Sequence, residues 1–169
     1  MRDLCKQIVL KATSEVVPQF RLDARGGIHG VPHWTRVWYH GRQIAHELEV
    51  NPAVLAWFAF LHDSQRRNDG TDPLHGARAA DYATRLRRRG VITELDGTHF
   101  EQLCEAMLLH SEGATIGEPV VQACWDADRL DLGRVSIRPR ADRLCTAPAR
   151  RAATIECALR MSIGQRRSP

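Results

Sequence analysis

The sequence predicts an all-helical fold built as a single domain. Apolar residues recur at three- and four-residue intervals along most of the 169 residues, and no stretch of alternating polarity is long enough to require a sheet. Two pairs of a capping residue and proline, Asn51-Pro52 and Asp72-Pro73, mark helix starts. A chain of this length can bury a substantial core without disulfides or structural zinc, so we expect one domain over residues 1–169.

Three predicted helices occupy the first third of the chain. Apolar residues at every fourth position predict an amphipathic helix over residues 3–17, and the glycine-rich segment "RLDARGGIHGVP" then predicts a loop over 21–32. The next helix is expected from His33 to about Leu48. After Asn51-Pro52, the run "AVLAWFAFLHD" is apolar on all sides, which predicts a helix through the middle of the core.

Four further helices complete the predicted bundle. One starts at Asp72-Pro73, runs through "LHGARAADYATRLRRR" and is closed by Gly90. Another covers Thr98 to His110, and the next lies within "EPVVQACWDADRLDLG". The last helix is expected over residues 148–162.

The composition limits the classes of protein to which the chain can belong. No apolar run approaches the roughly 20 residues that span a bilayer, and the N-terminal segment lacks the features of a secretory signal, so we expect no membrane association and a cytoplasmic location. The five cysteines never form a C-x-x-C motif, which argues against a disulfide framework or a zinc ribbon. The net charge of +4 comes almost wholly from arginine, which suits an anionic partner but also follows from a biased genome composition. The one basic run of the sequence, residues 87–89, lies at a predicted helix C-terminus, where the helix dipole favours basic residues. Nucleic acid is therefore not an expected partner.

Two histidines and two aspartates occupy positions where helices can bring them together. His33 opens a predicted helix, the doublet His62-Asp63 ends the buried helix, and Asp128 lies on a later helix. Imidazole and carboxylate are ligands of divalent hydrolytic metals, and this set leaves positions open for water. An ionised pair at the end of an apolar helix is costly unless it is compensated, and a metal ion provides that compensation. These four residues are therefore the predicted metal ligands.

The ordered set of His33, His62-Asp63 and Asp128 resembles the signature of the HD superfamily of metal-dependent phosphohydrolases, all-helical proteins named after the His-Asp doublet. The segment "ADRL" at 127–130 is similar to the one that carries their last aspartate. More narrowly, "HGVPHWTRV", "FAFLHDSQRRNDGTDPLHGARAA" and "CWDADRLDLGRVSI" resemble segments of a small group of stand-alone bacterial HD proteins. The resemblance covers about residues 25–140 and implies an HD-type helical bundle with a metal-dependent reaction.

The same resemblance bears on the number of metal ions. His75 and His110 occupy the order in which two-metal HD proteins place the ligands of a second ion, and Asp63 would then bridge both ions. The alternative is that these two histidines bind a substrate phosphate or a water. We therefore expect one or two divalent ions per chain, and Mn, Fe, Co, Ni, Zn and Mg are all compatible with the ligand types.

Basic and polar residues that follow the doublet are candidates for binding phosphate. Arg66 and Arg67 stand one turn beyond it, and one of them is expected to reach the site, although the sequence does not show which. Asn68 lies in a turn and could contact a phosphate oxygen or a hydroxyl, and Arg78 is a second candidate phosphate clamp, one turn after His75. The alternative is a capped helix end at which the macrodipole favours basic residues.

Three further residues are expected around the metal ligands rather than among them. His29, in the glycine-rich loop, is either an extra ligand or a residue of the entrance, and we expect the entrance. Asp126 competes with Asp128 for the role of ligand, and the resemblance selects Asp128. Asp126 and Asp131 are then expected to accept hydrogen bonds from a ligand imidazole or an arginine, or to be charges of the helix surface.

Together these residues predict a phosphohydrolase, either a phosphomonoesterase or a phosphodiesterase. Its substrate would be a small phosphorylated metabolite, most simply a nucleotide, attacked by a metal-activated water. One alternative is a di-iron HD-type oxygenase, because such enzymes use the same six-residue ligand order. Another is a non-catalytic HD module that binds a nucleotide. Substrate identity and oligomeric state are left open, a homodimer included.

Overall fold

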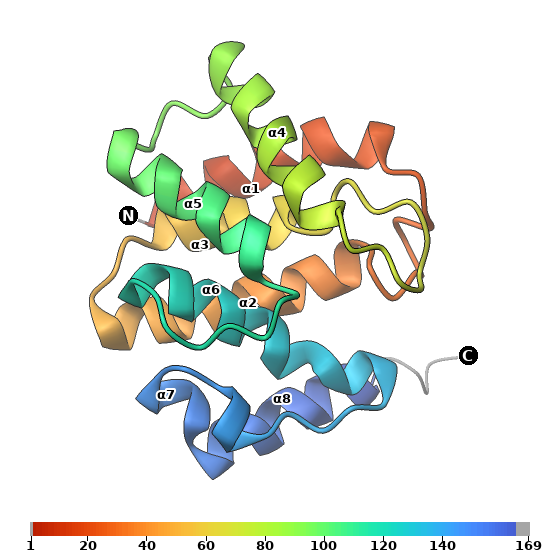
Figure 1. Ribbon diagram of the computed structural model, residues 1–169, viewed down its shortest axis with the longest axis vertical. Coiled ribbons are helices and arrows are strands. Elements are labelled where there is room, and N and C mark those ends of the chain that lie inside the picture. The colour runs from red at the N-terminus through yellow and green to blue at the C-terminus, as the bar shows by residue number, and fades with distance from the viewer. Residues whose placement is uncertain (1, 165–169) are drawn as a thin grey trace.

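Eight α-helices and three short 3-10 helices, with no strand, make up the fold of residues 2–164, the part of the chain that this computed structural model describes (Figure 1). The α-helices are α1 (Arg2–Val16), α2 (Val31–Leu48), α3 (Pro52–Leu61), α4 (His75–Arg88), α5 (Gly97–Leu109), α6 (Pro119–Leu130), α7 (Ala147–Arg150) and α8 (Ala152–Gly164). The 3-10 helices are η1 (Val17–Gln19), η2 (Asp131–Val135) and η3 (Ala141–Arg143). The predicted all-helical class is therefore confirmed for the described residues.

The apolar helix α3 lies at the centre of the fold. Its residues from Ala53 to Leu61 are all buried, as its sequence predicts. Asn51 caps the helix by accepting a hydrogen bond from the backbone N–H of Ala53. Helix α2 approaches α3 closely at Gly41, where an added Cβ would lie 3.3 Å from Cδ1 of Leu55. Glycine at this position therefore permits the tight packing of the two helices.

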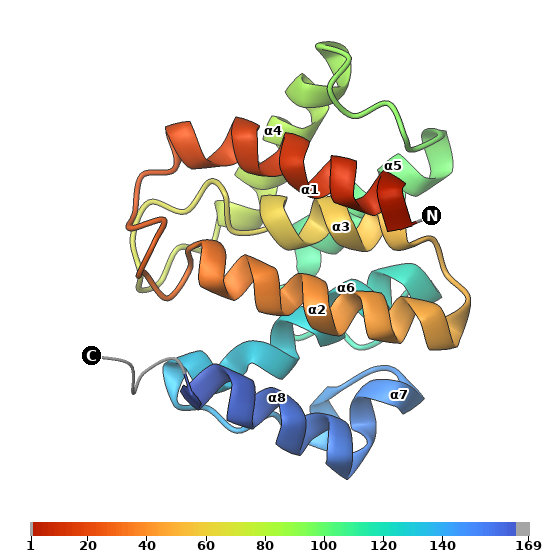
Figure 2. The same cartoon turned by 180° about the vertical axis from the view of Figure 1, so that it is seen from behind.

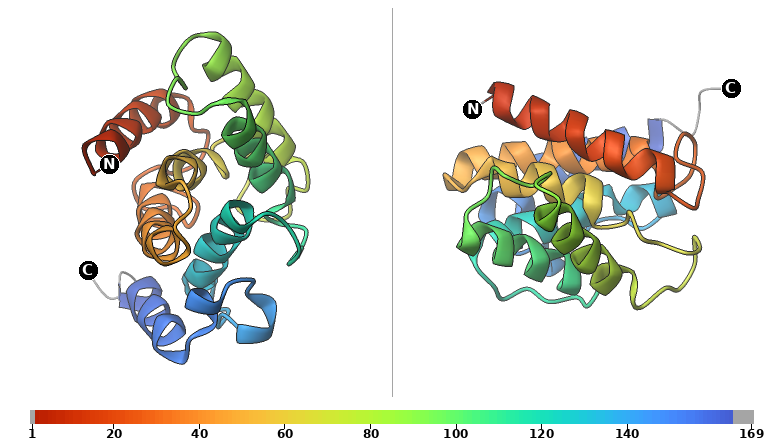
Figure 3. Two further views of the ribbon diagram at one scale, coloured as in Figure 1. Left: turned by 90° about the vertical axis from the view of Figure 1, so that its left-hand side faces the viewer. Right: turned by 90° about the horizontal axis from the view of Figure 1, so that it is seen from above.

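The other helices surround α3. Helices α1 and α2 pack against α3, α2 also packs against α6, and α5 contacts α3, α4 and α6. In the side view, α1 to α3 gather on one side and α4 to α6 on the other, with α7 and α8 at one end (Figure 3). This packing brings the C-terminal ends of α3 and α5 to the N-terminal ends of α2 and α4.

The C-terminal helix expected over residues 148–162 is in fact two helices. Thr146 caps α7, and Arg151 then adopts an extended conformation with ψ 134°. The carbonyl of Arg151 accepts the backbone N–H of Ile155, so Arg151 is the residue from which α8 starts, and its side chain pairs with Glu47 of α2. The apolar periodicity did not reveal this break because one extended residue leaves the pattern on either side helical.

Asp72 was expected to cap helix α4, but the helix begins three residues later and Leu74 stands at its N-cap position. The helix starts at His75, and the carboxylate of Asp72 accepts hydrogen bonds from the backbone of Arg67 and the side chain of Arg78 instead. Asp72 therefore closes the turn between α3 and α4 rather than the first turn of α4.

The ends of the predicted domain, residues 1 and 169, lie outside the described residues, and the limits of its core at about 25 and 140 stay a prediction. None of the helices in residues 2–164 combines the length and apolar character that crossing a bilayer requires.

Candidate metal centre

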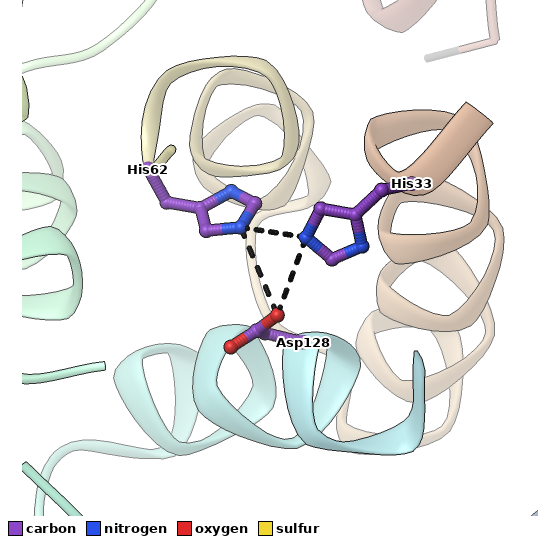
Figure 4. A group of neighbouring side chains, drawn as sticks. All are labelled: His33, His62 and Asp128. Atoms are coloured by element: carbon purple, nitrogen blue, oxygen red, sulfur yellow. Dashed lines mark hydrogen bonds and ion pairs between the residues drawn. The ribbon is translucent and has the colours of Figure 1, made fainter. Parts of the chain in front are cut away.

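Three helices deliver His33, His62 and Asp128 to one point (Figure 4). His33 is in the first turn of α2, His62 directly follows α3, and Asp128 is in the last turn of α6. The Nε2 atoms of the two histidines are 3.1 Å apart. Asp128 Oδ1 lies 3.4 Å from Nε2 of His33 and 3.7 Å from Nε2 of His62. Each side chain of this buried group could therefore offer one atom to a single ion.

Asp63 lies between this group and a second pair of histidines. Its Oδ2 atom is 3.6 Å from the Nε2 atoms of both His33 and His62. Its Oδ1 atom is 3.3 Å from Nε2 of His75 and 3.7 Å from Nε2 of His110, and these two nitrogens are 2.7 Å apart. The carboxylate thus faces two pairs of imidazoles through separate oxygens, an arrangement that suits a residue shared by two ions.

The other ring nitrogen of each of these four histidines faces a hydrogen-bond acceptor. The acceptors are carbonyl or carboxylate oxygens, so each Nδ1 carries a hydrogen and donates it. The four bonds join His33 to Asp131 at 2.7 Å, His62 to the carbonyl of Phe58 at 3.1 Å, His75 to the carbonyl of Asp72 at 2.5 Å and His110 to the carbonyl of Met107 at 2.7 Å. In the neutral rings all four Nε2 atoms therefore present lone pairs to the cluster.

This set of donor atoms fits a divalent cation. Two lone pairs that face each other repel unless a cation or a proton lies between them. Asp128 Oδ1 is buried without a hydrogen-bond partner among the described residues, which is costly for a carboxylate oxygen. Ligand atoms bound at about 2.1 Å stand roughly 3.0 to 3.4 Å apart, close to the separations seen here. The groups His33–His62–Asp128 and His62–Asp63–His110 could each hold an ion.

Burial and neighbouring charges set the protonation of the cluster. Burial lowers the pKa of His62 to about 3, so this ring is neutral at pH 7. Burial alone would raise the pKa of Asp63, but the neighbouring His62 and a hydrogen bond from His110 lower it well below its usual range. Burial would lower the pKa of His110, yet its hydrogen bond to Asp63 raises it. A proton on His110, or a cation in its place, would relieve the repulsion between the Nε2 lone pairs of His75 and His110, which are 2.7 Å apart.

Asp131, at the start of η2, orients His33 from behind the cluster. Its fully buried carboxylate accepts hydrogen bonds from His33, from Arg36 at 2.6 and 2.9 Å, and from the hydroxyl of Ser162 at 2.7 Å. Burial would raise the pKa of Asp131, but the hydrogen bonds from His33 and Arg36 lower it, so the group stays ionised. A carboxylate in this position fixes the tautomer of a ligand imidazole. The geometry is consistent with the expected role of Asp131.

Of the two arginines that follow the doublet, Arg66 faces the cluster. Its side chain is buried, and its Nη1 atom is 3.5 Å from Oδ1 of Asp63 and donates to Nε2 of His75 at 3.3 Å. That hydrogen bond agrees with a lone pair at Nε2 of His75. Arg67 is exposed. Tertiary packing thus selects one of the two candidates that the sequence left open.

The other two candidates for binding phosphate lie differently from the expectation. The side chain of Asn68 is exposed and accepts the backbone N–H of Gly70 within the turn. Arg78 donates to the carbonyl of Gln65 and to Asp72. Both side chains stabilise the turn between α3 and α4, because the backbone there presents acceptors and donors that must be paired.

Two of the residues expected around the ligands also require correction. His29 is only 6% exposed, and its Nδ1 lies 2.7 Å from Oδ2 of Asp63, so it contacts the shared carboxylate rather than lining an entrance. Asp126 points away from the cluster and accepts hydrogen bonds from the backbone of Cys145 and from both the backbone and the hydroxyl of Thr146. A helix turns by about 100° per residue, so a step of two residues changes the face. Asp126 therefore anchors the segment before α7.

Two residues that the sequence analysis did not predict, Arg134 and Ser162, contact side chains of the centre. Arg134 is buried in η2, with Nη1 3.7 Å from Oδ1 of Asp128, and its Nε donates to the carbonyl of Ile28 at 3.0 Å. Ser162 reaches Asp131 from the last turn of α8. Arg134 lies in the segment "CWDADRLDLGRVSI", but nothing in that segment singles it out, and no spacing connects Ser162 to the histidines.

Comparison with known proteins places the fold. No protein-family model and no curated protein sequence matches the chain. The chain is similar to the crystal structure of a predicted HD superfamily hydrolase from an uncultured Thermotogales bacterium, with 24% sequence identity and a TM-score of 0.63. The match covers 98% of this chain and 90% of that one. At this identity the likeness shows the fold, and it confirms the predicted HD-type helical architecture.

Proposed function

We propose that the protein is a metal-dependent phosphohydrolase that acts on a small phosphorylated metabolite. The proposal rests on one observation: the Nε2 atoms of four histidines and the carboxylates of Asp63 and Asp128 converge from segments of five helices. The similarity to a predicted HD superfamily hydrolase adds support. A nucleotide remains the simplest substrate that meets the requirements of such a site.

The charges around the cluster favour an anionic substrate. Each of three buried carboxylates has one arginine within ion-pair distance, namely Asp63 with Arg66 at 3.5 Å, Asp128 with Arg134 at 3.7 Å and Asp131 with Arg36 at 2.6 Å. These six charges cancel, so each divalent ion that binds leaves an excess of positive charge at the site. A phosphate group, with roughly two negative charges near pH 7, compensates this excess.

The side chains of the cluster have distinct roles in this proposal. The residues that would hold a first ion are His33, His62, Asp63 and Asp128, and those that face a second position are Asp63, His75 and His110. A divalent ion there would polarise a phosphoryl oxygen and lower the pKa of a water towards about 7. The guanidinium of Arg66 would bind phosphate oxygens whose charge develops during transfer. Asp131 keeps Nε2 of His33 free of hydrogen by accepting the hydrogen on Nδ1.

The first test counts and identifies the metal, then measures activity. Protein purified without chelator or affinity nickel is submitted to elemental analysis and assayed on nucleoside monophosphates, nucleoside triphosphates and cyclic dinucleotides. We expect hydrolysis that EDTA abolishes and added Mn²⁺ restores. Asp63→Asn should lower kcat at least about a hundredfold, because the shared carboxylate charge is lost. Asp69→Asn, an exposed aspartate in the following turn, should retain activity, and full activity of Asp63→Asn would contradict the proposal.

One observation also favours a second candidate, a di-iron oxygenase of the same fold. The two oxygens of Asp63 face separate pairs of histidines, as a carboxylate shared by two irons would. About two irons per chain, with oxygen consumption and no phosphate release, would favour this candidate. A ligand-induced rise in melting temperature without any product would instead favour a non-catalytic nucleotide-binding module.

A further inference from the structure

A cavity on the outer side of α2 lies apart from the metal centre. Its volume is about 650 Å³, within the range of roughly 300–1,000 Å³ that small-molecule sites occupy. Its lining residues come from η1, the loop that precedes α2, α2 itself and α8. Figure 2 shows the side of the fold on which α2 and α8 face the viewer. Its walls are mainly apolar and include Val17, Val31, Pro32, Tyr39 and Met161.

The charged residues that line this cavity are both arginines. Arg25 and Arg36 line it, and no carboxylate does. Arg36 is buried, and its guanidinium is bound to Asp131. Arg25 is exposed, and its side chain makes no hydrogen bond or ion pair within residues 2–164. The neighbouring Asp23 carboxylate instead accepts the backbone N–H groups of residues 25 and 26. An anionic group at the cavity would therefore be attracted by Arg25 without breaking a side-chain hydrogen bond, in competition with the nearby Asp23 carboxylate, which also attracts this guanidinium.

We propose that this cavity binds an amphipathic anion, a small molecule with a carboxylate or phosphate at one end and an aliphatic or aromatic body. The body would cover the apolar walls and release their hydration water. The anionic end would lie at the guanidinium of Arg25. The groove between α1 and α2 differs from this cavity in that a carboxylate, that of Glu49, lines it beside Lys6 and Arg42.

Two connections link the cavity to the metal centre. Arg36, which lines the cavity, binds Asp131, and Asp131 holds the imidazole of His33. The loop that carries Arg25 also carries His29, which contacts Asp63. A bound anion that shifts either contact would change the affinity for metal, and linkage requires the metal to change the affinity for the anion by the same factor. This coupling rests on the proposed function, whereas the binding of the anion does not.

The binding is tested on metal-stripped full-length protein with octanoate, using displacement of the fluorescent probe 1-anilinonaphthalene-8-sulfonate. Octanoate and octyl phosphate should displace the probe at concentrations at least about tenfold lower than octanol or octylammonium require. Arg25→Gln should weaken octanoate binding about three- to tenfold, and Arg21→Gln, an exposed arginine of the same loop outside the cavity lining, should not. Equal displacement by octanol and octanoate would overturn the proposed anion selectivity.

The location is tested with one substitution at two positions of α2. Thr35 and Gln43 are both exposed, and Thr35 lines this cavity while Gln43 lines the groove between α1 and α2. Thr35→Trp should fill the cavity and weaken octanoate binding at least about tenfold, whereas Gln43→Trp should leave it unchanged. Circular dichroism establishes that both variants are folded. Undiminished binding to folded Thr35→Trp would overturn the assignment.

The coupling is tested by titrating Mn²⁺ calorimetrically with and without saturating octanoate. We expect the Mn²⁺ affinity to change at least about threefold, which corresponds to a modest coupling. An unchanged Mn²⁺ affinity would overturn the coupling but leave the anion site in place. Absence of any Mn²⁺ binding would contradict the proposed function, and the coupling with it, while the displacement experiment would still decide whether the cavity binds anions.

Discussion

The position of one hydrogen on each imidazole determines what the cluster can bind. Acceptors at Nδ1 hold the hydrogens of His33, His62, His75 and His110 away from the centre. For three of the four rings the acceptor is a backbone carbonyl, which no substitution of a side chain removes. For His33 it is the carboxylate of Asp131, so this ring offers the clearest test of the tautomer.

Asp131→Asn should weaken Mn²⁺ binding about tenfold to a hundredfold. The amide of asparagine can donate to Nδ1 of His33, which would move the hydrogen to Nε2 and remove a ligand lone pair. Calorimetric titration of metal-stripped protein measures the effect. Asp142→Asn changes an exposed aspartate paired with Arg140 and should bind Mn²⁺ as the parent protein does. Unchanged affinity of Asp131→Asn would mean that Nε2 of His33 is not a ligand.

His40 makes folding stability depend on pH through burial. The ring is 4% exposed, and its Nε2 atom has no partner among the described residues. Burial lowers its pKa to about 4, although the charge of Asp131 opposes the effect. The ordinary pKa of histidine is about 6.5, so between pH 6.5 and 4 the unfolded chain binds more protons than the folded one. This group therefore costs stability as the pH falls through that window, by up to about 3 kcal/mol.

His40→Phe should remove this dependence. At pH 7 the variant should be about as stable as the parent protein, because both rings are then neutral. At pH 4 the free energy of unfolding of the variant should exceed that of the parent by about 3 kcal/mol. Urea denaturation at the two pH values measures the difference, with His46→Phe at an exposed position of α2 as the control. A difference that stays constant between pH 7 and pH 4 would exclude His40 as the source.

The candidate metal ligands lie at helix ends, so the geometry of the centre depends on the contacts between those ends. Gly76 shows this at the start of α4, where an added Cβ would lie 2.2 Å from the carbonyl oxygen of Met107 in α5. That approach cannot be accommodated without moving one backbone against the other. His75 and His110 stand at these two helix ends, so such a movement would also separate their Nε2 atoms.

Gly76→Ala should lower the free energy of unfolding by about 1–3 kcal/mol or more and weaken any metal site that uses both His75 and His110. Chemical denaturation and Mn²⁺ titration measure the two effects. Gly97→Ala is the matched control, because an added Cβ at the first position of α5 meets no atom within 4 Å. That control should be neutral or stabilising by at most about 1 kcal/mol. Equal stability of the two variants would show that the contact between α4 and α5 can relax.

The cluster connects five helices that otherwise meet mainly through apolar contacts. A bound ion would join α2, α3 and α6, and a second would add α4 and α5. Because a cation binds the assembled set of ligands and not the unfolded chain, it should stabilise the fold as a unit.

Mn²⁺ at a hundred times its dissociation constant should stabilise the protein by about 2.7 kcal/mol. For a chain of this size, that corresponds to a rise in Tm of roughly 5–10 °C. Differential scanning calorimetry with Mn²⁺ or with EDTA measures the shift. Asp63→Asn should show little or none of it, and a full shift in that variant would place the stabilising ion elsewhere on the chain.

Three features could be predicted from the amino-acid sequence alone: the helical class, the central place of the apolar run before His62, and the order of the residues that converge. These features follow from local patterns, because apolar residues spaced three and four apart are enough to identify the buried face of an amphipathic helix. The HD-type architecture also followed, through the resemblance carried by the His-Asp doublet. The role of the converging residues as metal ligands stays a prediction that the Mn²⁺ experiments decide.

The outer residues that reach the centre could be identified only from the packing of the helices. It selected Arg66 over Arg67, assigned Asp126 to the segment before α7, placed His29 against Asp63, and added Arg134. His29 and Arg66 lie in loops and Arg134 in a short 3-10 helix, where one residue more or less changes the direction of a side chain, and Asp126 lies on the face of α6 that turns away from the cluster. Their partners are up to 106 residues away in the chain, as with Arg134 and Ile28. Such contacts depend on how the helices pack against one another, which no pattern of three or four residues contains.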